Sequence, residues 1–436
     1  MPRVALHTLG CKLNYAETAT IGRQFHERGF ELVEFGEPAD VCVINTCSVT
    51  ARADRECRQL IRRALRVGPS PFVVVTGCYA QLEPEQVASI NGVDLVLGSH
   101  EKFELFRYLD GFTKLGAPRV HVSDSAELQT FGPAFSSEAG GRTRAYLKVQ
   151  DGCDYTCSFC TIPLARGESR SQPPEACLQQ AERLVREGFR EIVLTGVNVG
   201  DYGKKIGSSL VDLLGAMVAL EGLRRIRISS IEPNLLTPEL IDAVARNPKI
   251  CKHFHIPLQS GTDSVLRRMR RRYTTADYRE LIDAIRRRLP EAGIGVDVIT
   301  GFPGESEAEY ESTHRFLADL PVSYLHVFTY SERPNTLAAA MGEPVEPSLR
   351  YRRNDAIRIL GEKKRQAFAS AMVGRTLEVL AEADVRDGLR SGFTDNYVRV
   401  TMPADACDEN TIIPVRLTEA RDGRCAGQVV HGGGLG

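Results

Sequence analysis

The sequence has no excess of charge of one sign and no long apolar run. Its 55 Lys and Arg balance 56 Asp and Glu, for a net charge of −1, so bulk electrostatics neither indicate nor exclude a nucleic-acid partner. No stretch approaches the roughly 18–20 apolar residues that cross a bilayer. Residues 1–8 contain one Arg and lack the apolar core of a secretory signal. We therefore expect a soluble, cytoplasmic protein with no membrane partner.

Cysteine is too sparse for a disulfide scaffold. The chain has 12 Cys among 436 residues, well below the roughly 8–10% of such scaffolds, and a chain of this length can bury cores without cross-links. Thiols of a cytoplasmic protein stay reduced. Each Cys is therefore expected to be a packing residue, a metal ligand or a catalytic group.

The pattern of apolar runs predicts an α/β fold in three parts. In residues 1–125, β-rich runs at 4–8, 41–45 and 72–76 alternate with helical segments at 16–29 and 52–66, which predicts parallel βαβ units. Residues 123–144 are rich in Ser, Gly, Ala and Pro and have no clear period. This segment is expected to be a linker or a surface excursion.

The remaining chain predicts two further domains. Residues 140–370 contain six β-like runs separated by helical stretches, which favours a partial (β/α)6 barrel; the runs are 145–150, 191–195, 226–230, 253–258, 295–300 and 323–329. Residues 371–431 contain five short strands with Asp, Gly and Asn turns, typical of a small all-β barrel; they are 376–382, 390–394, 397–402, 411–420 and 424–430. Residues 432–436 are expected to be disordered.

Three cysteines form a C-x-x-x-C-x-x-C run just after the first barrel strand. Cys153, Cys157 and Cys160 thus lie at the carboxyl end of a strand, the edge where α/β proteins build their active sites. Three thiolates at this spacing suit a four-iron cube with one iron left open. A zinc site is the alternative, but zinc usually takes a fourth ligand nearby, and the next His is His253.

A second set of three cysteines is spread over the first domain. Cys11, Cys47 and Cys78 each follow one of its three predicted strands, and parallel strands bring their carboxyl ends to one edge of the sheet. Convergence there again gives three ligands and an open position. The alternative is three independent packing thiols, which is also our interpretation of the other six cysteines: Cys42, Cys57, Cys177, Cys251, Cys407 and Cys425.

These motifs together resemble the radical S-adenosylmethionine (SAM) methylthiotransferase family. The resemblance covers nearly the whole chain and is carried by the two cysteine sets within Leu9-Gly-Cys-Lys-Leu-Asn14, Ile44-Asn-Thr-Cys47, Val75-Thr-Gly-Cys78 and Ile256-Pro-Leu-Gln-Ser-Gly261. It implies a methylthiotransferase N-terminal domain, a radical SAM core and a C-terminal TRAM barrel that binds RNA. It also implies two 4Fe-4S clusters, the second of which holds the sulfur to be inserted, and a deoxyadenosyl radical formed from SAM.

The resemblance also suggests residues that bind SAM. Phe159 precedes the last cysteine of the loop, Thr195, Gly196 and Asn198 follow one strand, and Ser230 and Glu232 end the next. The alternative for the glycine-containing segments, including 298–304, is a tight strand-to-helix turn that needs Gly.

The segment around Cys11 indicates the substrate branch. Within the family, Gly10-Cys-Lys-Leu-Asn-Tyr-Ala-Glu-Thr18 is most similar to enzymes acting on threonylcarbamoyladenosine at position 37 of tRNA, beside the anticodon. Enzymes acting on isopentenyladenosine or on a ribosomal protein aspartate remain alternatives. After the cysteine, the isopentenyladenosine enzymes usually carry Gln-Met, and the protein-modifying enzymes usually carry one residue followed by Lys-Asn. This chain has Lys12 and Leu13 there. Partners implied are the tRNA anticodon loop and an electron donor such as a flavodoxin or a ferredoxin.

Charge distribution supports an RNA partner only in part. Arginine runs at 55–66, 267–272 and 286–288 can neutralise phosphates, although such runs are more often solvated helix faces. From residue 364 to 430 nine Lys and Arg face ten Asp and Glu, so the last barrel is not basic. Phe393 and Tyr397 there can stack on bases or belong to the core. A non-catalytic iron–sulfur electron carrier or redox sensor, and a zinc-stabilised RNA-binding protein, remain competing hypotheses.

Overall fold

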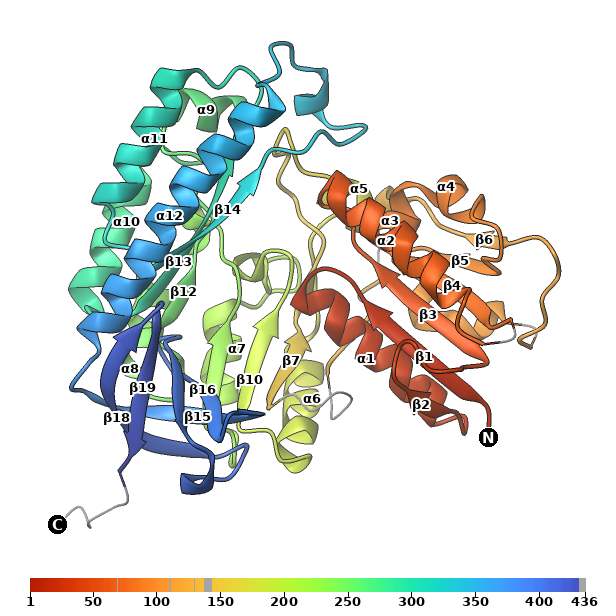
Figure 1. Cartoon of the computed structure of the whole chain (residues 1–436), viewed down its shortest axis with the longest axis horizontal. Coiled ribbons are helices and arrows are strands. Elements are labelled where there is room, and N and C mark those ends of the chain that lie inside the picture. The colour runs from red at the N-terminus through yellow and green to blue at the C-terminus, as the bar shows by residue number, and fades with distance from the viewer. Residues whose placement is uncertain (69, 110, 129, 137–142, 431–436) are drawn as a thin grey trace.

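A computed structural model describes residues 1–68, 70–109, 111–128, 130–136 and 143–430. Figure 1 shows an N-terminal α/β unit beside the edge of a partial barrel, with a small β-barrel below it at the C-terminus. The α/β class with a closing all-β barrel is therefore confirmed. The predicted disordered tail, residues 432–436, lies outside the described residues.

The N-terminal unit is built on a six-stranded parallel sheet in the order β2-β1-β3-β4-β5-β6. Its central strands are the three predicted ones, and the other three have only three residues each, too few to show a pattern in sequence. The strands are β1 (Arg3–Thr8), β2 (Glu31–Val33), β3 (Val41–Thr46), β4 (Phe72–Gly77), β5 (Leu95–Leu97) and β6 (Arg119–His121).

Helices cover both faces of this sheet. On one face Val41 and Val43 pack with Ile21 and Phe25, while on the other Cys42 and Ile44 pack with Ile61. Burial on both faces explains why these strands appear as continuous apolar runs. The helices are α1 (Lys12–His26), α2 (Ala51–Ala64), α3 (Cys78–Leu82), α4 (Pro84–Ala88) and the 3-10 helix η1 (Glu101–Tyr108).

The central unit is the predicted partial barrel. Six parallel strands follow one another in chain order, with single bridges joining the third to the fourth. They are β7 (Arg144–Lys148), β10 (Glu191–Thr195), β11 (Arg225–Ile228), β12 (His253–His255), β13 (Gly293–Thr300) and β14 (Tyr324–Thr329). A continuous core of aliphatic side chains separates the strands from the helices outside, namely α6 (Pro174–Arg186), α7 (Leu210–Val218), α8 (Pro238–Arg246), α9 (Asp263–Arg268), α10 (Thr275–Arg288) and α11 (Glu307–Asp319).

Shorter elements complete the unit around the first barrel strand. They are β8 (Gln150–Asp151), α5 (Ile162–Arg166), β9 (Arg170–Ser171) and the 3-10 helices η2 (Ser125–Glu127), η3 (Val199–Asp201), η4 (Pro233–Leu235) and η5 (Leu337–Ala340). The predicted linker is partly packed: Ala134 and Phe135 are buried, and Phe135 forms an antiparallel bridge with Leu147. The expectation of a surface excursion is therefore wrong for Ala134 and Phe135.

A long helix leads into the C-terminal barrel. Helix α12 (Pro347–Ala371) is followed by five strands that close in the order β15-β16-β17-β19-β18. They are β15 (Thr376–Arg386), β16 (Leu389–Thr394), β17 (Arg399–Pro403), β18 (Ile412–Arg421) and β19 (Arg424–Val429), with η6 (Ala404–Ala406) between β17 and β18. The predicted strand 397–402 begins two residues late, because Tyr397 lies in a turn at φ +72°. Within the described residues, no helix combines the length and apolarity needed to span a membrane.

Candidate active site

The loop after β8 carries the first cysteine triplet. The Cys153 N–H donates to the Gly167 carbonyl at 3.0 Å, and the Cys160 N–H donates to the Cys157 carbonyl at 3.1 Å. Gly152, just before the triplet, has φ +69°, and a Cβ there would lie 1.9 Å from the Glu168 carbonyl oxygen. Only glycine fits such a position, so the chain is folded tightly at the start of the triplet.

The three thiols of this loop are close enough to act on one another electrostatically. Burial, with a smaller contribution from the neighbouring Cys157, raises the pKa of Cys153 and of Cys160 to about 12. The donor set is therefore three sulfurs in a partly buried loop, which suits iron–sulfur ligation better than a hard cation.

Arg271 contacts this triplet from α9's C-terminal side. Its Nη1 donates to Cys157 Sγ at 3.0 Å, and its Nη2 pairs with the Glu232 carboxylate. Glu232, predicted to bind the cofactor, is thus linked to the triplet through the Arg271 side chain. Sequence reasoning treated Arg271 as one of a run of phosphate-binding or solvated arginines, whereas its side chain is only 3% exposed.

The other predicted SAM-binding residues lie at the ends of β10 and β11. Asn198 accepts from the Glu232 N–H at 3.3 Å and donates to Asp201 at 2.8 Å. Thr195 bonds the Leu147 carbonyl, Ser230 bonds His255 Nδ1 at 2.5 Å, and Gly196 packs against Gln150. The structure thus brings Asn198 and Glu232 together. The Thr195 and Ser230 hydroxyls, by contrast, already form hydrogen bonds to other groups of the barrel.

Phe159 lines a cavity of about 330 Å³ beside the triplet. Its wall includes Cys160, Asp297 and Phe328 from the central unit and Thr50 from the N-terminal unit. The two units therefore enclose a space that one thiol of the triplet borders.

The second triplet converges as the parallel sheet predicts. Cys11, Cys47 and Cys78 follow β1, β3 and β4, and burial raises the pKa of Cys47 to about 12, with Cys78 and then Cys11 adding to the shift. A Cβ on Gly10, at φ +99°, would lie 2.8 Å from Cys47 Cβ, so glycine permits this approach. Cys11 is exposed and the other two are buried.

Cys57 adds a fourth thiol that sequence reasoning assigned to packing alone. It is fully buried on α2, and its Sγ donates to the Cys47 carbonyl at 3.3 Å. Cys57 thus supports the backbone that carries Cys47. The remaining packing predictions describe side chains that are buried, with Cys407 half-buried.

A buried charge network joins the two units that carry the triplets. The Glu17 carboxylate accepts from Lys102 at 2.6 Å, from Lys148 at 3.0 Å and from Arg166 at 2.9 and 3.1 Å. Arg166 also reaches Asp151 at 3.0 Å and Asn14 Oδ1 at 2.6 Å. Each of these charged side chains is at most 6% exposed. The network therefore ties α1 of the N-terminal unit to β7 and α5 of the central unit.

The Glu17 carboxylate of this network stays ionised despite its burial. Burial opposes the Glu17 charge, but Arg166 and the two lysines hold the pKa of Glu17 well below 4.5. Cys78 is among the groups that raise the pKa of Arg166, and Arg166 in turn lowers the pKa of Cys11 against the effect of burial. Sequence reasoning missed this network; the available signal was the spacing of Cys11, Asn14 and Glu17 along one helix face.

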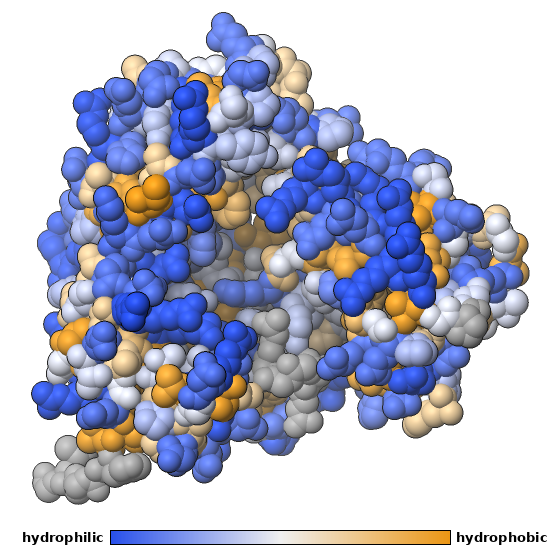
Figure 2. Space-filling view, in the orientation of Figure 1, coloured by the Kyte–Doolittle hydropathy of each residue, from blue (hydrophilic) through white to orange (hydrophobic). Residues whose placement is uncertain are grey.

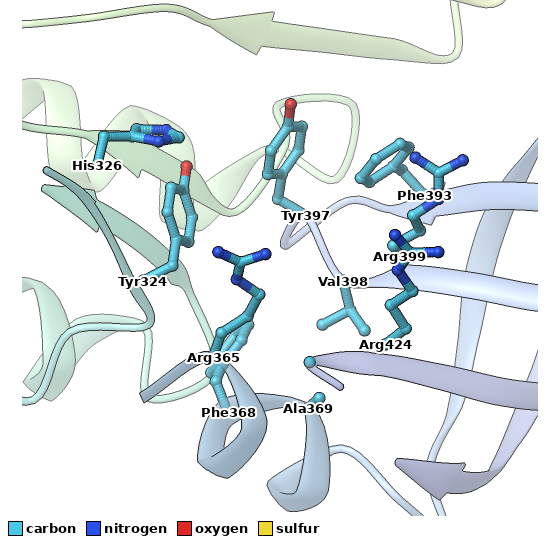
Figure 3. Close-up of a pocket in the computed structure, with 11 residues that line it drawn as sticks. Tyr324, His326, Arg365, Phe368, Ala369, Phe393, Tyr397, Val398, Arg399 and Arg424 are labelled. Atoms are coloured by element: carbon cyan, nitrogen blue, oxygen red, sulfur yellow. The ribbon is translucent and has the colours of Figure 1, made fainter. Parts of the chain in front are cut away.

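Figure 2 shows a hollow between the N-terminal unit and the central barrel, near the centre of the view. A second cavity of about 240 Å³ opens between the central and C-terminal barrels. In Figure 3 the phenol oxygens of Tyr324 and Tyr397 point the same way, with Arg365 between the rings and Phe393 beside Tyr397. The rings of Phe393 and Tyr397 are stacked with centroids 4.9 Å apart.

The basic runs separate into structural and exposed arginines. Within 267–272, Arg268 pairs with Glu309, and in 286–288 Arg286 bonds three carbonyls. Helix α2 is different: its outer face forms the strongly hydrophilic surface over the N-terminal unit in Figure 2, and Arg55 and Arg62 are exposed on it.

Comparison with known proteins identifies the family. Models described as "Radical SAM superfamily" and "Uncharacterized protein family UPF0004" match residues 147–317 and 3–98. The threonylcarbamoyladenosine tRNA methylthiotransferase MtaB of Bacillus subtilis is 40% identical over 430 residues, covering 96% of this chain and 94% of the relative. The chain belongs to the radical SAM methylthiotransferase family. Membership makes it an enzyme and implies a 4Fe-4S cluster and SAM.

Among further relatives of this methylthiotransferase, those of the predicted branch have the higher identity. The MtaB of Aquifex aeolicus is 38% identical, covering 91% of this chain and 96% of the relative. A tRNA-2-methylthio-N(6)-dimethylallyladenosine synthase of Dictyoglomus thermophilum is 32% identical, with 99% of both chains covered. The resemblance to the threonylcarbamoyladenosine branch is thus confirmed. The radical SAM methyltransferase TsrM of Kitasatospora setae shares the fold, with a TM-score of 0.57 at 16% identity over 94% of this chain and 84% of that one.

Proposed function

We propose that this methylthiotransferase adds a methylthio group to C2 of N6-threonylcarbamoyladenosine at position 37 of tRNA, beside the anticodon. The observation that carries the proposal is the presence of two three-thiol sets, each following strand ends, in a chain similar over nearly its full length to enzymes named for this substrate. Structural zinc is held by four protein ligands. A zinc-stabilised RNA-binding protein therefore does not explain two sets of three thiols, each with an open position.

The first triplet is proposed to hold the cluster that binds SAM. Cys153, Cys157 and Cys160 supply three soft ligands, and SAM supplies a radical able to activate an unreactive C–H bond. The Arg271 guanidinium contacts Cys157 Sγ and offsets negative charge there. The Glu232 N–H donates to Asn198 Oδ1 at the strand ends; with Phe159, Thr195, Gly196 and Ser230 these two residues are the proposed SAM contacts.

The second triplet is proposed to hold a second 4Fe-4S cluster and the sulfur to be transferred. Exposure of Cys11, with Cys47 and Cys78 buried, suits a cluster whose open position faces the hollow. The buried Glu17–Arg166 network fixes this sulfur site relative to the first triplet.

The C-terminal barrel is proposed to contact the tRNA at the second cavity. Its net charge is slightly negative, but the cavity wall collects Arg365, Arg399 and Arg424 beside the stacked Phe393 and Tyr397. Arginines bind phosphates and aromatic rings stack on unpaired bases, so the local surface suits a single-stranded anticodon loop. We further propose a cytoplasmic location and a flavodoxin or ferredoxin as electron donor.

Anaerobic reconstitution followed by nucleoside mass spectrometry tests this proposal. With SAM, a reductant and tRNA carrying threonylcarbamoyladenosine, we expect about eight irons per chain, from two four-iron cubes, and 2-methylthio-threonylcarbamoyladenosine as product. The same tRNA with isopentenyladenosine serves as the matched control. Product from the isopentenyl substrate alone would reassign the branch, and 5′-deoxyadenosine release without any modified nucleoside would contradict a tRNA substrate.

A further inference from the structure

Two histidines and an aspartate meet inside the central barrel, separate from both cysteine sets. His255, Asp297 and His326 come from the neighbouring strands β12, β13 and β14. Residues next to them in sequence, such as Phe254 and Val296, belong to the core on the helix side of the sheet. Because side chains alternate between the two faces of a strand, His255, Asp297 and His326 all face the barrel interior.

The ligand atoms of these three side chains are close enough to share one ion. One nitrogen of each imidazole and one oxygen of the carboxylate all lie within 4.8 Å of one another. His255 Nε2 is 2.8 Å from Asp297 Oδ1, and the rings of His255 and His326 meet edge to face with centroids 5.4 Å apart. Two ligands of one ion lie at most about 4.3 Å apart, twice a bond of about 2.0–2.2 Å. A small rotation of a side chain therefore completes the set.

The hydrogen bonds around the two imidazoles suit metal ligation. Ser230 Oγ lies 2.5 Å from His255 Nδ1, so His255 Nε2 is the nitrogen that faces Asp297. Imidazoles that bind metals usually use their other ring nitrogen in such a hydrogen bond, which fixes the tautomer and the ring orientation. Within the part of the chain that the structure describes, His326 forms no hydrogen bond and contacts His255 and Tyr324 through ring edges. Its nitrogens are therefore available to an ion.

The site can be reached from two cavities. Asp297 lines the cavity of about 330 Å³ beside the first cysteine triplet. His326 lines the cavity of about 240 Å³ between the two barrels, where Figure 3 shows it beside Tyr324. The interior of a closed barrel is usually filled by layers of branched apolar side chains, whereas this layer is polar and only partly buried. Water or a ligand oxygen can thus occupy coordination positions that the protein leaves open.

We propose that His255, Asp297 and His326 form a binding site for one divalent transition-metal ion, such as Fe²⁺, Mn²⁺ or Zn²⁺, with positions open to water or to an anionic oxygen of a bound ligand. Two imidazoles and one carboxylate are a donor set that such ions prefer, whereas the two sets of thiols suit iron–sulfur clusters. The site does not depend on the substrate proposed above. The competing explanation is a hydrogen-bonded Ser–His–Asp chain that binds no ion.

Titration of the reconstituted, tag-free protein with Mn²⁺, followed by electron paramagnetic resonance, tests the site without turnover. The protein is first passed over a chelating resin, and Mn²⁺ is used because thiolates compete poorly for it. We expect one Mn²⁺ per chain, displaced by one equivalent of Zn²⁺ because Zn²⁺ binds imidazole sites more tightly. Ser230→Ala should weaken Mn²⁺ binding about tenfold, as loss of a partner of a ligating histidine does. Asp297→Asn and His326→Gln, which remove ligands, should weaken it further.

His26→Gln is the matched control, because His26 is exposed on α1 and should bind Mn²⁺ as the wild type does. Iron content, about eight per chain for two four-iron clusters, and the unfolding midpoint check that each variant is intact. Failure of the wild type to bind Mn²⁺ at millimolar concentration would overturn the inference, as would equal affinities in the wild type, Asp297→Asn and His326→Gln. Neither result bears on the proposed function, which fails only if the wild type forms no methylthiolated nucleoside.

Discussion

Replacing Glu17 by Gln should strongly destabilise the junction between the N-terminal unit and the barrel. Glu17 is fully buried and is the only carboxylate among the described residues that pairs with the equally buried Lys102. Lys148 and Arg166 keep Asp151 as a partner, so Lys102 is the charge left uncompensated. Removing one partner of a buried pair costs about 3–5 kcal/mol, which corresponds to a fall of about 3–5 °C in Tm when the whole chain unfolds together, at about 2.1 cal/mol/K of unfolding entropy per residue.

The pH dependence follows from the sign of the Glu17 shift. Because its pKa is held well below 4.5 in the folded protein, the stabilisation is fully present above that value and is lost as pH falls through the folded-state pKa. The difference in unfolding free energy between wild type and Glu17→Gln should therefore be constant from pH 8 to pH 6. It should shrink only in acid below the unfolded value.

Thermal and urea unfolding followed by circular dichroism measure this difference. Glu27→Gln, exposed just beyond the end of the same helix, is the control and should stay within about 0.5 kcal/mol of wild type. Adding Lys102→Met to Glu17→Gln removes the stranded charge and should recover much of the loss. A Glu17→Gln loss below about 1 kcal/mol, or a double variant no more stable than the single one, would refute the assigned role of the network.

Three further substitutions address the cysteine sites. Cys157→Ala should abolish 5′-deoxyadenosine release, measured by liquid chromatography, whereas Cys47→Ala should retain release but yield no methylthiolated nucleoside; loss of release in Cys47→Ala would contradict this division of roles. Gly152→Ala places a Cβ 1.9 Å from a carbonyl oxygen and should lower the iron content from about eight to about four per chain. Gly215→Ala, whose Cβ would meet open space, should leave the iron content unchanged.

The sequence revealed those parts of the fold and site that depend on local pattern. Buried parallel strands appear as apolar runs, so the strand-end positions of Cys11, Cys47 and Cys78 follow from periodicity alone. Three-residue strands such as β5 are too short for such a signal. The Glu17–Arg166 contact spans 149 residues and depends on how two units dock, which no local pattern encodes. Arg271 was misjudged for the same reason: its partner Glu232 comes from another strand end.

The Glu17–Arg166 pair lies six residues after Cys11 and six residues after Cys160. One guanidinium is thus tied to both cysteine segments. With Arg170, which lies 3.8 Å from Asp151, four cations and two carboxylates leave the network with two positive charges. When both triplets carry clusters, an electron added at one changes the field at the other through charges that water does not screen. The two centres should therefore titrate as a coupled pair, with reduction potentials that belong to the pair rather than to either cluster.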